Sequence, residues 1–385
     1  MKRRSLTRRT GVFVVGLALL VAACGPDETE PDPTVDDTEP EPTAEEEPAV
    51  DDAETFELSL AAANGREHAT SHATAWWIER VEELTDGRVT ISASWGGAMM
   101  PFPELLAGAG DGRVDIANGN TTFHPAELPV SQLTTVPFVQ YDIEAQVRAL
   151  HDAYQEHEAL RGEYEASNVH VLAFQPMDQI TIASDEPWTG IDDIDGQRIR
   201  ALGRWAEALE ILGAEPIAVP FGEVYEAAQR GLIDGVGLNF EGIADTRVYE
   251  QMDYLTDPNA GSVSTMLLFI NLDVWNDLPQ DIQDAMTQAA EEHYDEVSRI
   301  YGEVLRGECE SMHDTGVEFS AWDDAEVDRW LDVVGDSILE AWSDEVADIE
   351  GAAEFTDFYF DRMAEHEPAS EWQSGLSICM DVAGS

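Results

Sequence analysis

The stretch Glu223–Asn239, EVYEAAQRGLIDGVGLN, repeats a pattern that occurs earlier at Glu104–Asn120, ELLAGAGDGRVDIANGN. In each copy a glutamate opens an apolar helical run. A glycine follows eight residues later, where a helix commonly ends in the left-handed conformation. An aspartate comes three residues further on, and an asparagine closes a strand-like run five residues after that. The two copies predict the same helix–turn–strand unit in both halves of the chain.

Asn120 and Asn239 close the two predicted strands. In α/β sheets, ligands bind beyond the carboxyl ends of the strands. Two lobes that face each other would therefore bring both asparagines into one cleft. The alternative is a chance similarity between two common helix–strand units, in which case the asparagines share no role.

Strand-like and helix-like runs alternate along the chain, which favours an α/β fold with mainly parallel strands. The strands are expected in 55–63, 88–95, 114–120, 169–175, 179–185, 198–202, 215–220, 233–239 and 265–271. The helices are expected in 68–87, 101–112, 204–214, 221–231 and 280–307. The last helix would be about 40 Å long at 1.5 Å per residue, enough to brace two lobes.

The composition is strongly acidic. Among 385 residues there are 79 Asp and Glu against 20 Lys and Arg, a net charge of −59. Such a body repels nucleic acid and anionic membrane surfaces, so nucleic acid is not expected as a partner. A solvated surface suited to a salty habitat explains the charge, because salt screens the self-repulsion. Attraction of cations or basic partners is the alternative.

The N-terminus predicts export. Basic residues from Lys2 to Arg9 precede an apolar run at Gly11–Ala23, which has the length of a signal-peptide core rather than of a membrane span. The run ends in LVAACG, which resembles a lipobox. We therefore expect a signal peptide over 1–24, a lipidated Cys24, and a protein anchored through this lipid at the outer face of the cell membrane. The alternative is an ordinary cleaved signal with a chance cysteine. The twin-arginine and general export routes both stay open.

Between the signal and the folded body lies a Pro-, Glu-, Asp- and Thr-rich segment over 25–54, with almost nothing to bury. This composition predicts a disordered acidic linker. The two remaining cysteines, Cys309 and Cys379, are expected to form a disulfide, since thiols outside the cytoplasm usually pair. Reactive or metal-ligating thiols are the alternative, although neither cysteine lies in a CxxC motif.

The stretch DDIDGQRIRALG, Asp192–Gly203, contains a short strand that carries Arg198 and Arg200. An arginine in a core strand is costly unless it meets an anion. That anion comes either from the protein itself or from an external ligand. The candidate internal partners are Asp192, Asp193 and Asp195.

Several stretches together resemble the solute-binding proteins of TRAP transporters, the DctP-like family. They are DIDGQRIRALG at 193–203, LGAEPIAVPFGEVYEAAQRGLIDG at 212–235, VPF at 136–138 and LFINLDVWNDLPQDIQDAM at 268–286. The resemblance covers roughly Phe56 to Gly302. It implies a bilobed α/β fold of the class II periplasmic-binding type, with hinge strands and a long bracing helix. It also implies an extracytoplasmic protein that closes on an organic acid and delivers it to the TRAP membrane permease subunits.

The same resemblance divides the chain. It implies a first lobe over 55–177 and a second lobe over 178–262. The segment 263–385 would supply a returning strand, the bracing helix and C-terminal helices that pack on both lobes.

The resemblance places the ligand carboxylate on Arg200, whose planar guanidinium can form two parallel hydrogen bonds with it. Arg198 is instead expected to pair with one of the protein's own acids. Phe221 would pack on the ligand, or else make only a hydrophobic contact at a helix start. The ligand's polar contacts would come from Asn64, Asn120 and Asn239, with Leu238 as the alternative to Asn239 by one residue of register.

The sequence departs from parts of the family pattern. By ungapped counting, Gln179 falls where many members carry a second arginine. Phe102 and Phe123 fall where sugar-acid binders have charged residues. Trp95 and Trp205 are expected near the same rim, although tryptophans more often lie in a core. One carboxylate with a less polar or aromatic remainder therefore fits better than a doubly charged or densely hydroxylated acid.

Other functions have weaker support. The chain contains no G-x-S-x-G, H-E-x-x-H, Walker or dinucleotide-binding motif. We therefore expect neither an enzyme nor a cofactor. His68 and His72 are spaced i, i+4 beside Glu67, a spacing that can chelate a metal, but the sequence places no third ligand. No metal is expected. A metal-binding or ligand-sensing lipoprotein is the alternative.

Overall fold

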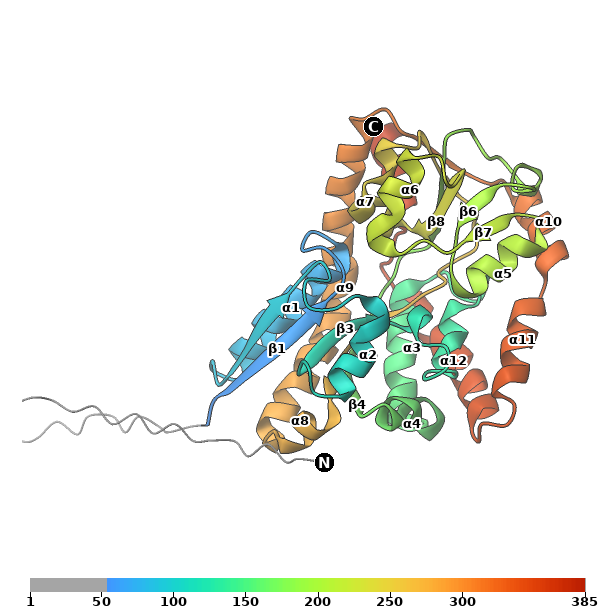
Figure 1. The fold of residues 1–385 in the computed structure, drawn as a ribbon. Coiled ribbons are helices and arrows are strands. Elements are labelled where there is room, and N and C mark those ends of the chain that lie inside the picture. Colours follow the sequence, from blue (N-terminus) through green and yellow to red (C-terminus); the bar gives the residue numbers. More distant parts are fainter. Residues whose placement is uncertain (1–53, 385) are drawn as a thin grey trace, which may run out of the picture. The chain divides into compact units, whose positions relative to one another are not determined.

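The computed structural model describes residues 54–384 (Figure 1). The predicted signal peptide, Cys24 and the linker up to residue 53 lie outside the described residues. Among the helices of 54–384, none is both long and apolar enough to cross a membrane.

Eleven strands of the described part form two sheets. The first has five strands, in the order β2-β1-β3-β10-β4: β2 (Val89–Ser94), β1 (Phe56–Ala62), β3 (Ile116–Asn120), β10 (Met266–Asn271) and β4 (Val169–Gln175). The second has six, in the order β11-β9-β5-β8-β6-β7: β11 (Glu318–Ala321), β9 (Tyr254–Asp257), β5 (Ile180–Ser184), β8 (Gly235–Asn239), β6 (Arg198–Arg200) and β7 (Glu215–Ile217).

The two sheets share one plan. The order β2-β1-β3-β10-β4 corresponds strand for strand to β7-β6-β8-β5-β9, and β11 adds a sixth strand beside β9. Each corresponding pair of strands has the same parallel or antiparallel sense. The repeat seen in the sequence is therefore part of a structural repeat that extends over five strands.

Within the repeat, corresponding residues have corresponding roles. Gly112 and Gly231 end their helices with φ of +69° and +64°, a conformation that glycine adopts without strain. The Asp115 carboxylate accepts the backbone N–H of Ser59 on β1 at 2.8 Å. The Asp234 carboxylate likewise accepts the backbone N–H of Arg198 on β6 at 2.9 Å. Each aspartate thus ties its own strand to the parallel neighbour.

Parallel pairing predominates as predicted, but only narrowly, because both sheets are mixed. Five strand pairs are parallel and four are antiparallel. The antiparallel pairs all involve β5 and β10, the strands that enter each sheet from the other one, across 176–179 and 258–265. Each starts at the edge where its neighbours end: Ile180 pairs with Asn239, and Met266 pairs with Asn120. A strand that enters at that edge must run in the opposite direction.

Thirteen α-helices of the described part surround the sheets. They are α1 (Ala69–Leu84), α2 (Phe102–Gly110), α3 (Ile143–Glu156), α4 (Glu158–Ala166), α5 (Gly203–Ile211), α6 (Val224–Gln229), α7 (Phe240–Thr246), α8 (Leu272–Asp277), α9 (Gln280–His313), α10 (Asp324–Val334), α11 (Ser337–Val346), α12 (Ala352–His366) and α13 (Gly375–Gly384).

The predicted long helix is α9, whose 34 residues continue six residues past the predicted end. Its first half packs against the first sheet, where Ile282 and Met286 join the core around Leu60. Its second half packs against the second sheet, where Val297 and Leu305 join a different core. In Figure 1, α9 runs past both sheets. The helix therefore braces the two halves, as expected.

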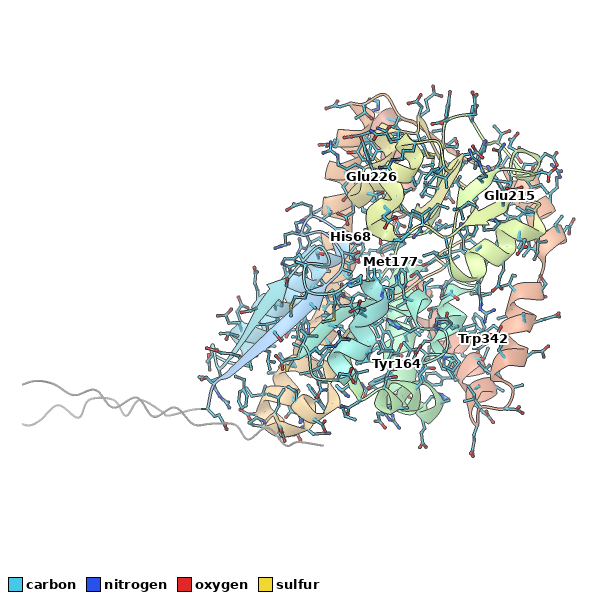
Figure 2. All side chains as sticks on the ribbon, viewed as in Figure 1. His68, Tyr164, Met177, Glu215, Glu226 and Trp342 are labelled. Carbon is cyan, nitrogen blue, oxygen red and sulfur yellow. A yellow bond between two sulfur atoms is a disulfide. The ribbon has the colours of Figure 1, made fainter. Side chains whose placement is uncertain are left out.

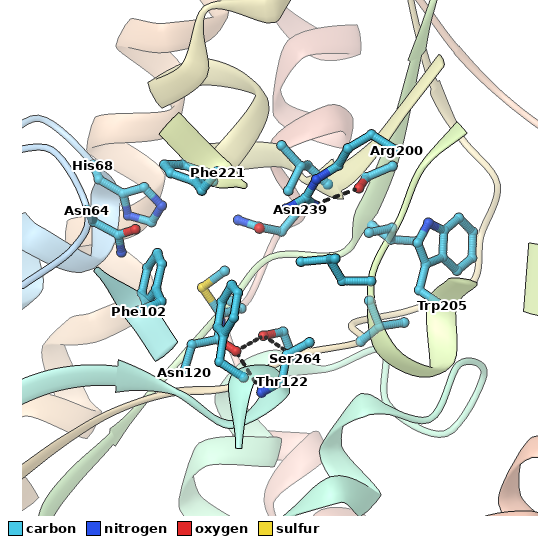
Figure 3. A pocket seen from close by; sticks show the side chains of 17 residues that line it. Asn64, His68, Phe102, Asn120, Thr122, Arg200, Trp205, Phe221, Asn239 and Ser264 are labelled. Atoms are coloured by element: carbon cyan, nitrogen blue, oxygen red, sulfur yellow. Dashed lines mark hydrogen bonds between the residues drawn. The ribbon is translucent and has the colours of Figure 1, made fainter. Parts of the chain in front are cut away.

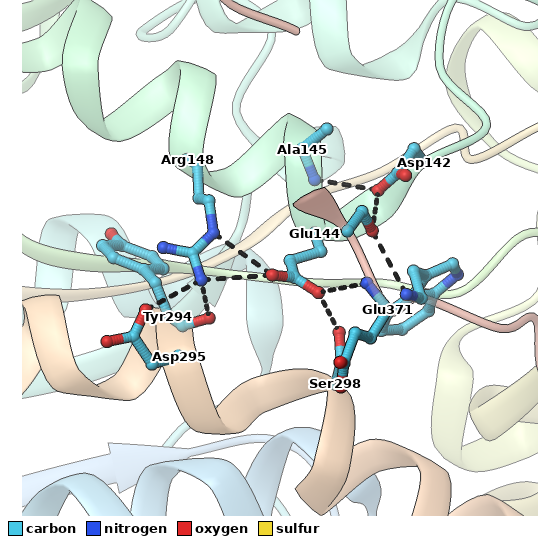
Figure 4. Close-up of polar contacts among 10 residues, drawn as sticks. Asp142, Glu144, Ala145, Arg148, Tyr294, Asp295, Ser298 and Glu371 are labelled. Atoms are coloured by element: carbon cyan, nitrogen blue, oxygen red, sulfur yellow. Dashed lines mark hydrogen bonds and ion pairs between the residues drawn. The ribbon is translucent and has the colours of Figure 1, made fainter. Parts of the chain in front are cut away.

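A buried ionic network fastens α9 to α3 and to the C-terminal segment (Figure 4). The Glu144 carboxylate accepts hydrogen bonds from Arg148, from the Ser298 hydroxyl and from the backbone N–H of Glu371. Arg148 also pairs with Asp295 on α9 at 3.0 Å. Three separate segments are thus held by one buried carboxylate, which is satisfied by charge and by hydrogen bonds.

The C-terminal helices pack against helices and loops that flank the two sheets. Trp330 on α10 lies against Trp205 on α5, with ring centroids 5.4 Å apart. Trp342 on α11 is buried and donates its indole N–H to the carbonyl of Pro129 at 2.9 Å (Figure 2). The tail after α12 returns to α9, where Cys379 of α13 forms a disulfide with Cys309.

This disulfide gives a stability prediction. Replacing Cys309 and Cys379 together with serine opens a loop whose ends are 70 residues apart. On the chain-entropy account, the loss is about 4 kcal/mol of unfolding free energy. Urea unfolding under oxidising conditions measures it. A double variant as stable as the wild type would mean that the cores on both sides of α13 hold the tail without the bond.

Candidate functional site

A partly open cavity of about 70 Å³ lies where the carboxyl ends of β3 and β8 face each other (Figure 3). Eight of the ten residues predicted to contact a ligand line it. They are Asn64, Phe102, Asn120, Phe123, Arg200, Trp205, Phe221 and Asn239. The residues come from both halves of the repeat, so the cavity is shared between the two sheets.

Arg200, the last residue of β6, supplies the positive charge of this cavity. Its side chain is buried, and its guanidinium reaches only carbonyl oxygens: Nε donates to Val219 at 3.2 Å and an Nη donates to Gly237 at 3.4 Å. Burial lowers the pKa of Arg200 to about 10, which still leaves the group charged at neutral pH. Several of its N–H donors remain available to a ligand.

None of the internal acids considered as partners forms an ion pair with Arg200, and Asp193 instead accepts the backbone N–H of Thr189 at 2.7 Å. Asp192 pairs with Arg329 at 2.9 Å. Arg198 pairs, as expected, with an acid of the protein, but this acid is Asp234 rather than one of the aspartates in its own stretch. Of the two arginines buried in the described part, Arg204 pairs with Glu345, whereas Arg200 has no carboxylate within ion-pair distance.

The three predicted asparagines are buried, and they differ in which side-chain atoms lack a hydrogen bond. Oδ1 of Asn120 accepts both the backbone N–H of Thr122 and the hydroxyl of Ser264, at 2.9 Å each. This fixes the amide so that its Nδ2 is the remaining donor. The Nδ2 atom of Asn64 is buried without a hydrogen-bond acceptor. The Nδ2 atom of Asn239 makes no hydrogen bond of ordinary geometry, although it lies close enough to the Glu241 carboxylate to lower its pKa. In Figure 3 the Asn239 amide points into the cavity. Unmet donors of this kind are costly until a ligand accepts from them.

Three phenylalanines form an aromatic wall. Phe102 and Phe123 stack with ring centroids 5.0 Å apart, and Phe221 meets Phe102 edge to face at 6.1 Å. Phe102 and Phe123 belong to segments next to the first sheet, while Phe221 follows β7 of the second. The same three rings also line a neighbouring apolar cavity of about 450 Å³. The aromatic wall thus separates the polar cavity from an outer apolar one.

Trp205 lines the cavity from a buried position on α5. Its indole lies directly over Gly237, and a Cβ at that position would overlap Nε1. Gly237 is therefore required for the close approach of α5 to β8. The Gly237 carbonyl is one of the two that hold Arg200. One glycine thus positions both the tryptophan and the arginine.

Two predicted residues, Gln179 and Trp95, lie outside the lining. The Gln179 amide donates to the carbonyl of Tyr141 at 3.1 Å. It turns away because side chains alternate along a strand and the adjacent Ile180 faces the cavity. Trp95 follows β2, the edge strand of the first sheet, and its ring lies under the guanidinium of Arg66. Trp95 therefore lies at the edge of the sheet, too far from the central strand β3 to reach the cavity.

The remaining lining residues were not predicted as contacts. They are His68, Thr122, Met177, Ile180, Leu202, Gly237, Leu238, Val263 and Ser264, of which only Leu238 had been considered as a register alternative. Met177, Val263 and Ser264 lie on the crossing segments, where only the knowledge that β5 and β10 change sheets could have placed them. His68 is buried at the start of α1 rather than exposed beside His72. Among 54–384, no group of three metal-ligating side chains is assembled.

Two buried carboxylates, those of Glu241 and Asp178, hold together segments next to the cavity. The Glu241 carboxylate, at the start of α7, accepts the backbone N–H of Asp178 at 2.9 Å. The Asp178 carboxylate in turn accepts the N–H groups of Gln179 and of Gly375. Burial raises the pKa of Glu241 to about 6. These bonds tie one crossing segment to α7 and to the C-terminal tail, next to Asn239.

Two similar sheets, joined by crossing strands, enclose a polar cavity at their carboxyl edges. Together they define the class of bilobed α/β solute-binding proteins. Residues 60–344 match DctP, the bacterial extracellular solute-binding protein family 7, and the chain belongs to this family.

Relatives and solved structures agree with this family. The chain is 26% identical over 280 residues to the C4-dicarboxylate-binding periplasmic protein DctP of Rhodobacter capsulatus, covering 71% of this chain and 81% of that protein. It is 25% identical over 218 residues to the ectoine-binding periplasmic protein TeaA of Halomonas elongata, covering 56% of this chain and 63% of the relative's length. A TRAP solute-binding protein from Rhodoferax ferrireducens T118, in complex with copurified benzoate, gives a TM-score of 0.74 at 18% identity, covering 82% of this chain and 99% of that one. At this identity, the structural likeness establishes the fold alone.

Gly237→Ala tests how the cavity wall is held. The added methyl group must displace Trp205, so we expect a loss of about 1–3 kcal/mol of unfolding free energy from overpacking. Gly162→Ala is the matched control, because a Cβ there meets nothing within 4 Å. Urea unfolding of both variants measures the difference. Equal stability of the two would mean that α5 can move away from β8 at no cost.

A second prediction concerns Glu308 on α9. Burial, and then the neighbouring carboxylates of Glu241, Asp245 and Asp178, raise its pKa from 4.5 to about 9. The folded protein therefore holds a proton that the unfolded protein releases above pH 4.5, so stability falls as pH rises towards 9. This group should lower the unfolding free energy of the wild type by about 1 kcal/mol per pH unit between pH 6 and 8. Glu308→Gln should remove that pH dependence. Urea unfolding at several pH values measures the slope, with Glu310→Gln on the exposed face of α9 as the control. Equal slopes in the wild type and in Glu308→Gln would contradict it.

Proposed function

We propose that this protein captures the carboxylate anion of a small organic acid in the cavity between the two sheets and delivers it to a TRAP membrane permease. The observation that carries this proposal is Arg200, a buried guanidinium without an acidic partner in the described part of the chain. The family is a solute-binding family rather than an enzyme family.

The energetics of Arg200 support an external anion. Leaving a buried charge unpaired costs several kcal/mol, and two carbonyl contacts of 3.2 and 3.4 Å compensate only in part. A carboxylate can accept two parallel hydrogen bonds from a guanidinium, and such charge-assisted pairs are the strongest in proteins. The guanidinium is buried, so a pair formed there is screened less by water than a pair on the surface.

The rest of the lining indicates the ligand's character. Arg200 is the only charged arginine or lysine among the lining residues, and no carboxylate lines the cavity. This supports a ligand with one negative charge and no positive charge. It speaks against a C4-dicarboxylate, which would leave one charge unpaired. The aromatic wall supports a flat or apolar body, and benzoate, found in the Rhodoferax structure, has that combination of features.

In this proposal the two crossing segments form the hinge on which the cleft closes. Residues 176–179 and 258–265 run side by side, since the Ser262 hydroxyl donates to the Met177 carbonyl at 3.0 Å and the N–H of Ile180 donates to the Gly261 carbonyl at 3.0 Å. Two adjacent crossings form a hinge that can bend without unfolding either sheet. On the far side of the cleft, the backbone N–H of Gly65 donates to Asp245 on α7 at 3.2 Å, a contact that opening would break.

The exported, lipid-anchored state also belongs to this proposal. Lipidation at Cys24, with the acidic segment as a tether, would keep the binding body near the permease at the outer face of the cell membrane. Metabolic labelling with a radioactive fatty acid, comparing the wild type with Cys24→Ser, tests that part separately from ligand binding.

Variants of Arg200 test the central claim. Arg200→Gln removes the charge, and we expect roughly a hundredfold weaker binding of the best carboxylate ligand. Arg200→Lys keeps the charge but not the planar fork, and should weaken binding at least about tenfold. Without ligand, Arg200→Gln should be as stable as the wild type or more stable, because it removes an unpaired buried charge.

The measurement is isothermal titration calorimetry with acids selected by a thermal-shift screen at high salt. Arg198→Lys is the matched control, since this neighbouring arginine pairs with Asp234 on the protein surface. Carboxylate affinity that is unchanged in both Arg200 variants would remove the basis of the proposed function.

A further inference from the structure

The cavity has a second polar end, away from Arg200. In Figure 3, Asn64 and His68 lie together on the side opposite Arg200, with Asn239 between them and the arginine. Asn64 is buried, and its Nδ2 has no acceptor. A buried donor of this kind is costly when it is unmet, so it points to a ligand atom that accepts from it.

His68 contributes a second donor at this end. It caps α1 through Nδ1, which accepts the backbone N–H of Thr70 at 3.1 Å. Burial, together with the charge of His72, lowers the pKa of His68 to about 3, so the ring is neutral. A neutral ring that accepts at Nδ1 carries its proton on Nε2. No described residue accepts a hydrogen bond from that N–H.

The charge at this end limits what the ligand can place there. The nearest arginine in sequence, Arg66, is exposed and lies over the Trp95 ring outside the cavity. A second carboxylate of the ligand would therefore be buried against neutral donors only, which is unfavourable. An ammonium or amidinium group would meet no carboxylate in the lining. An uncharged acceptor, such as a carbonyl oxygen, suits two neutral N–H donors.

We propose that Asn64 and His68 form a second recognition subsite, which binds an uncharged carbonyl oxygen at the end of the ligand remote from its carboxylate. The preferred ligands are thus monocarboxylates with a distal keto, lactam or amide group. This inference rests on the proposed function, because it takes the carboxylate to be on Arg200. The crossing segments and the aromatic wall enclose the body between the two ends.

The test compares keto acids with the parent acids that lack the carbonyl. The ligands are levulinate against pentanoate, and the two homologous keto acids with one and two more methylene groups against their own parents. We expect at least one keto acid to bind the wild type about tenfold more tightly than its parent, the effect of one buried hydrogen-bond acceptor. Calorimetric titration of the protein at high salt gives both affinities.

His68→Asn is the diagnostic variant. Asparagine keeps the helix cap, which it forms well, but its short side chain places no donor where Nε2 lies. We expect the preference for the keto acid to vanish, where the preference is the ratio of keto-acid affinity to parent-acid affinity measured within the same variant. His72→Asn, four residues further along α1 and outside the lining, is the matched control and should keep the preference. Asn64→Leu is a second variant of similar size, which should also reduce the preference.

The outcomes are distinct. Equal affinity of the wild type for every keto acid and its parent overturns the subsite, and so does a preference that survives in both His68→Asn and Asn64→Leu. In either case the proposed function stands as long as the parent acids bind and Arg200→Gln abolishes their binding. If no carboxylate of either series binds the wild type and none is found in the wider screen, carboxylate capture itself is wrong, and the subsite falls with it.

Discussion

Among the described residues, Arg200 is the one buried guanidinium without an acidic partner, and this charge determines what the rest of the cleft must provide. The chain has 79 acidic residues and only 20 basic ones, so a shortage of acids does not explain why a buried arginine lacks an acidic partner. None of the acids close to Arg200 in sequence pairs with it, Asp192 pairs with Arg329 instead, and no acid lines the cavity. Carbonyls of Val219 and Gly237 hold the group in place without neutralising it. Its charge therefore remains available to an anion from outside.

The sheet plan explains why this charge lies in a cleft. Each sheet receives one strand from the other half of the chain, and each of these strands starts at the edge where its neighbours end. Both crossings therefore pass along the same edge, beside Asn120 and Asn239. In the proposed closure, bending at these crossings would let the carboxyl ends of both sheets approach or separate together. Helix α9 contributes to two cores and limits how far they can move apart.

The sequence predicted those parts of the site that follow from local pattern. The repeat placed Gly112 and Gly231 at helix ends and both asparagines at the cavity, because each copy is a self-contained helix–turn–strand unit. Resemblance to the family added Arg200. What failed depended on three-dimensional placement. The prediction for Gln179 rested on counting without regard to strand alternation, and that for Trp95 on nearness in sequence to an edge strand.

His68 shows a different limit. Its spacing from His72 suggested a metal pair, a relation between two side chains on one helix face. The structure instead uses His68 as a helix cap, which fixes its tautomer and turns the other nitrogen towards the cavity. Neither the burial nor the direction of that ring can be inferred from spacing alone. They depend on the approach of α7 and the crossing segments, which come more than a hundred residues later.

The acidic surface and the proposed anion site have opposite electrostatic effects on a carboxylate ligand, and these effects act over different distances. A net charge of −59 repels an approaching carboxylate, but salt screens this repulsion beyond about 10 Å at 0.1 M ionic strength. The proposed pair with Arg200 would form at contact distance around a buried guanidinium, where salt screens it far less. High salt therefore removes most of the repulsion that would slow the approach of a carboxylate. It leaves the proposed pairing with Arg200 largely intact. In the proposed function, a chain of this composition can bind an anion because Arg200 is buried without an acidic partner among the described residues, and no carboxylate lines the cavity.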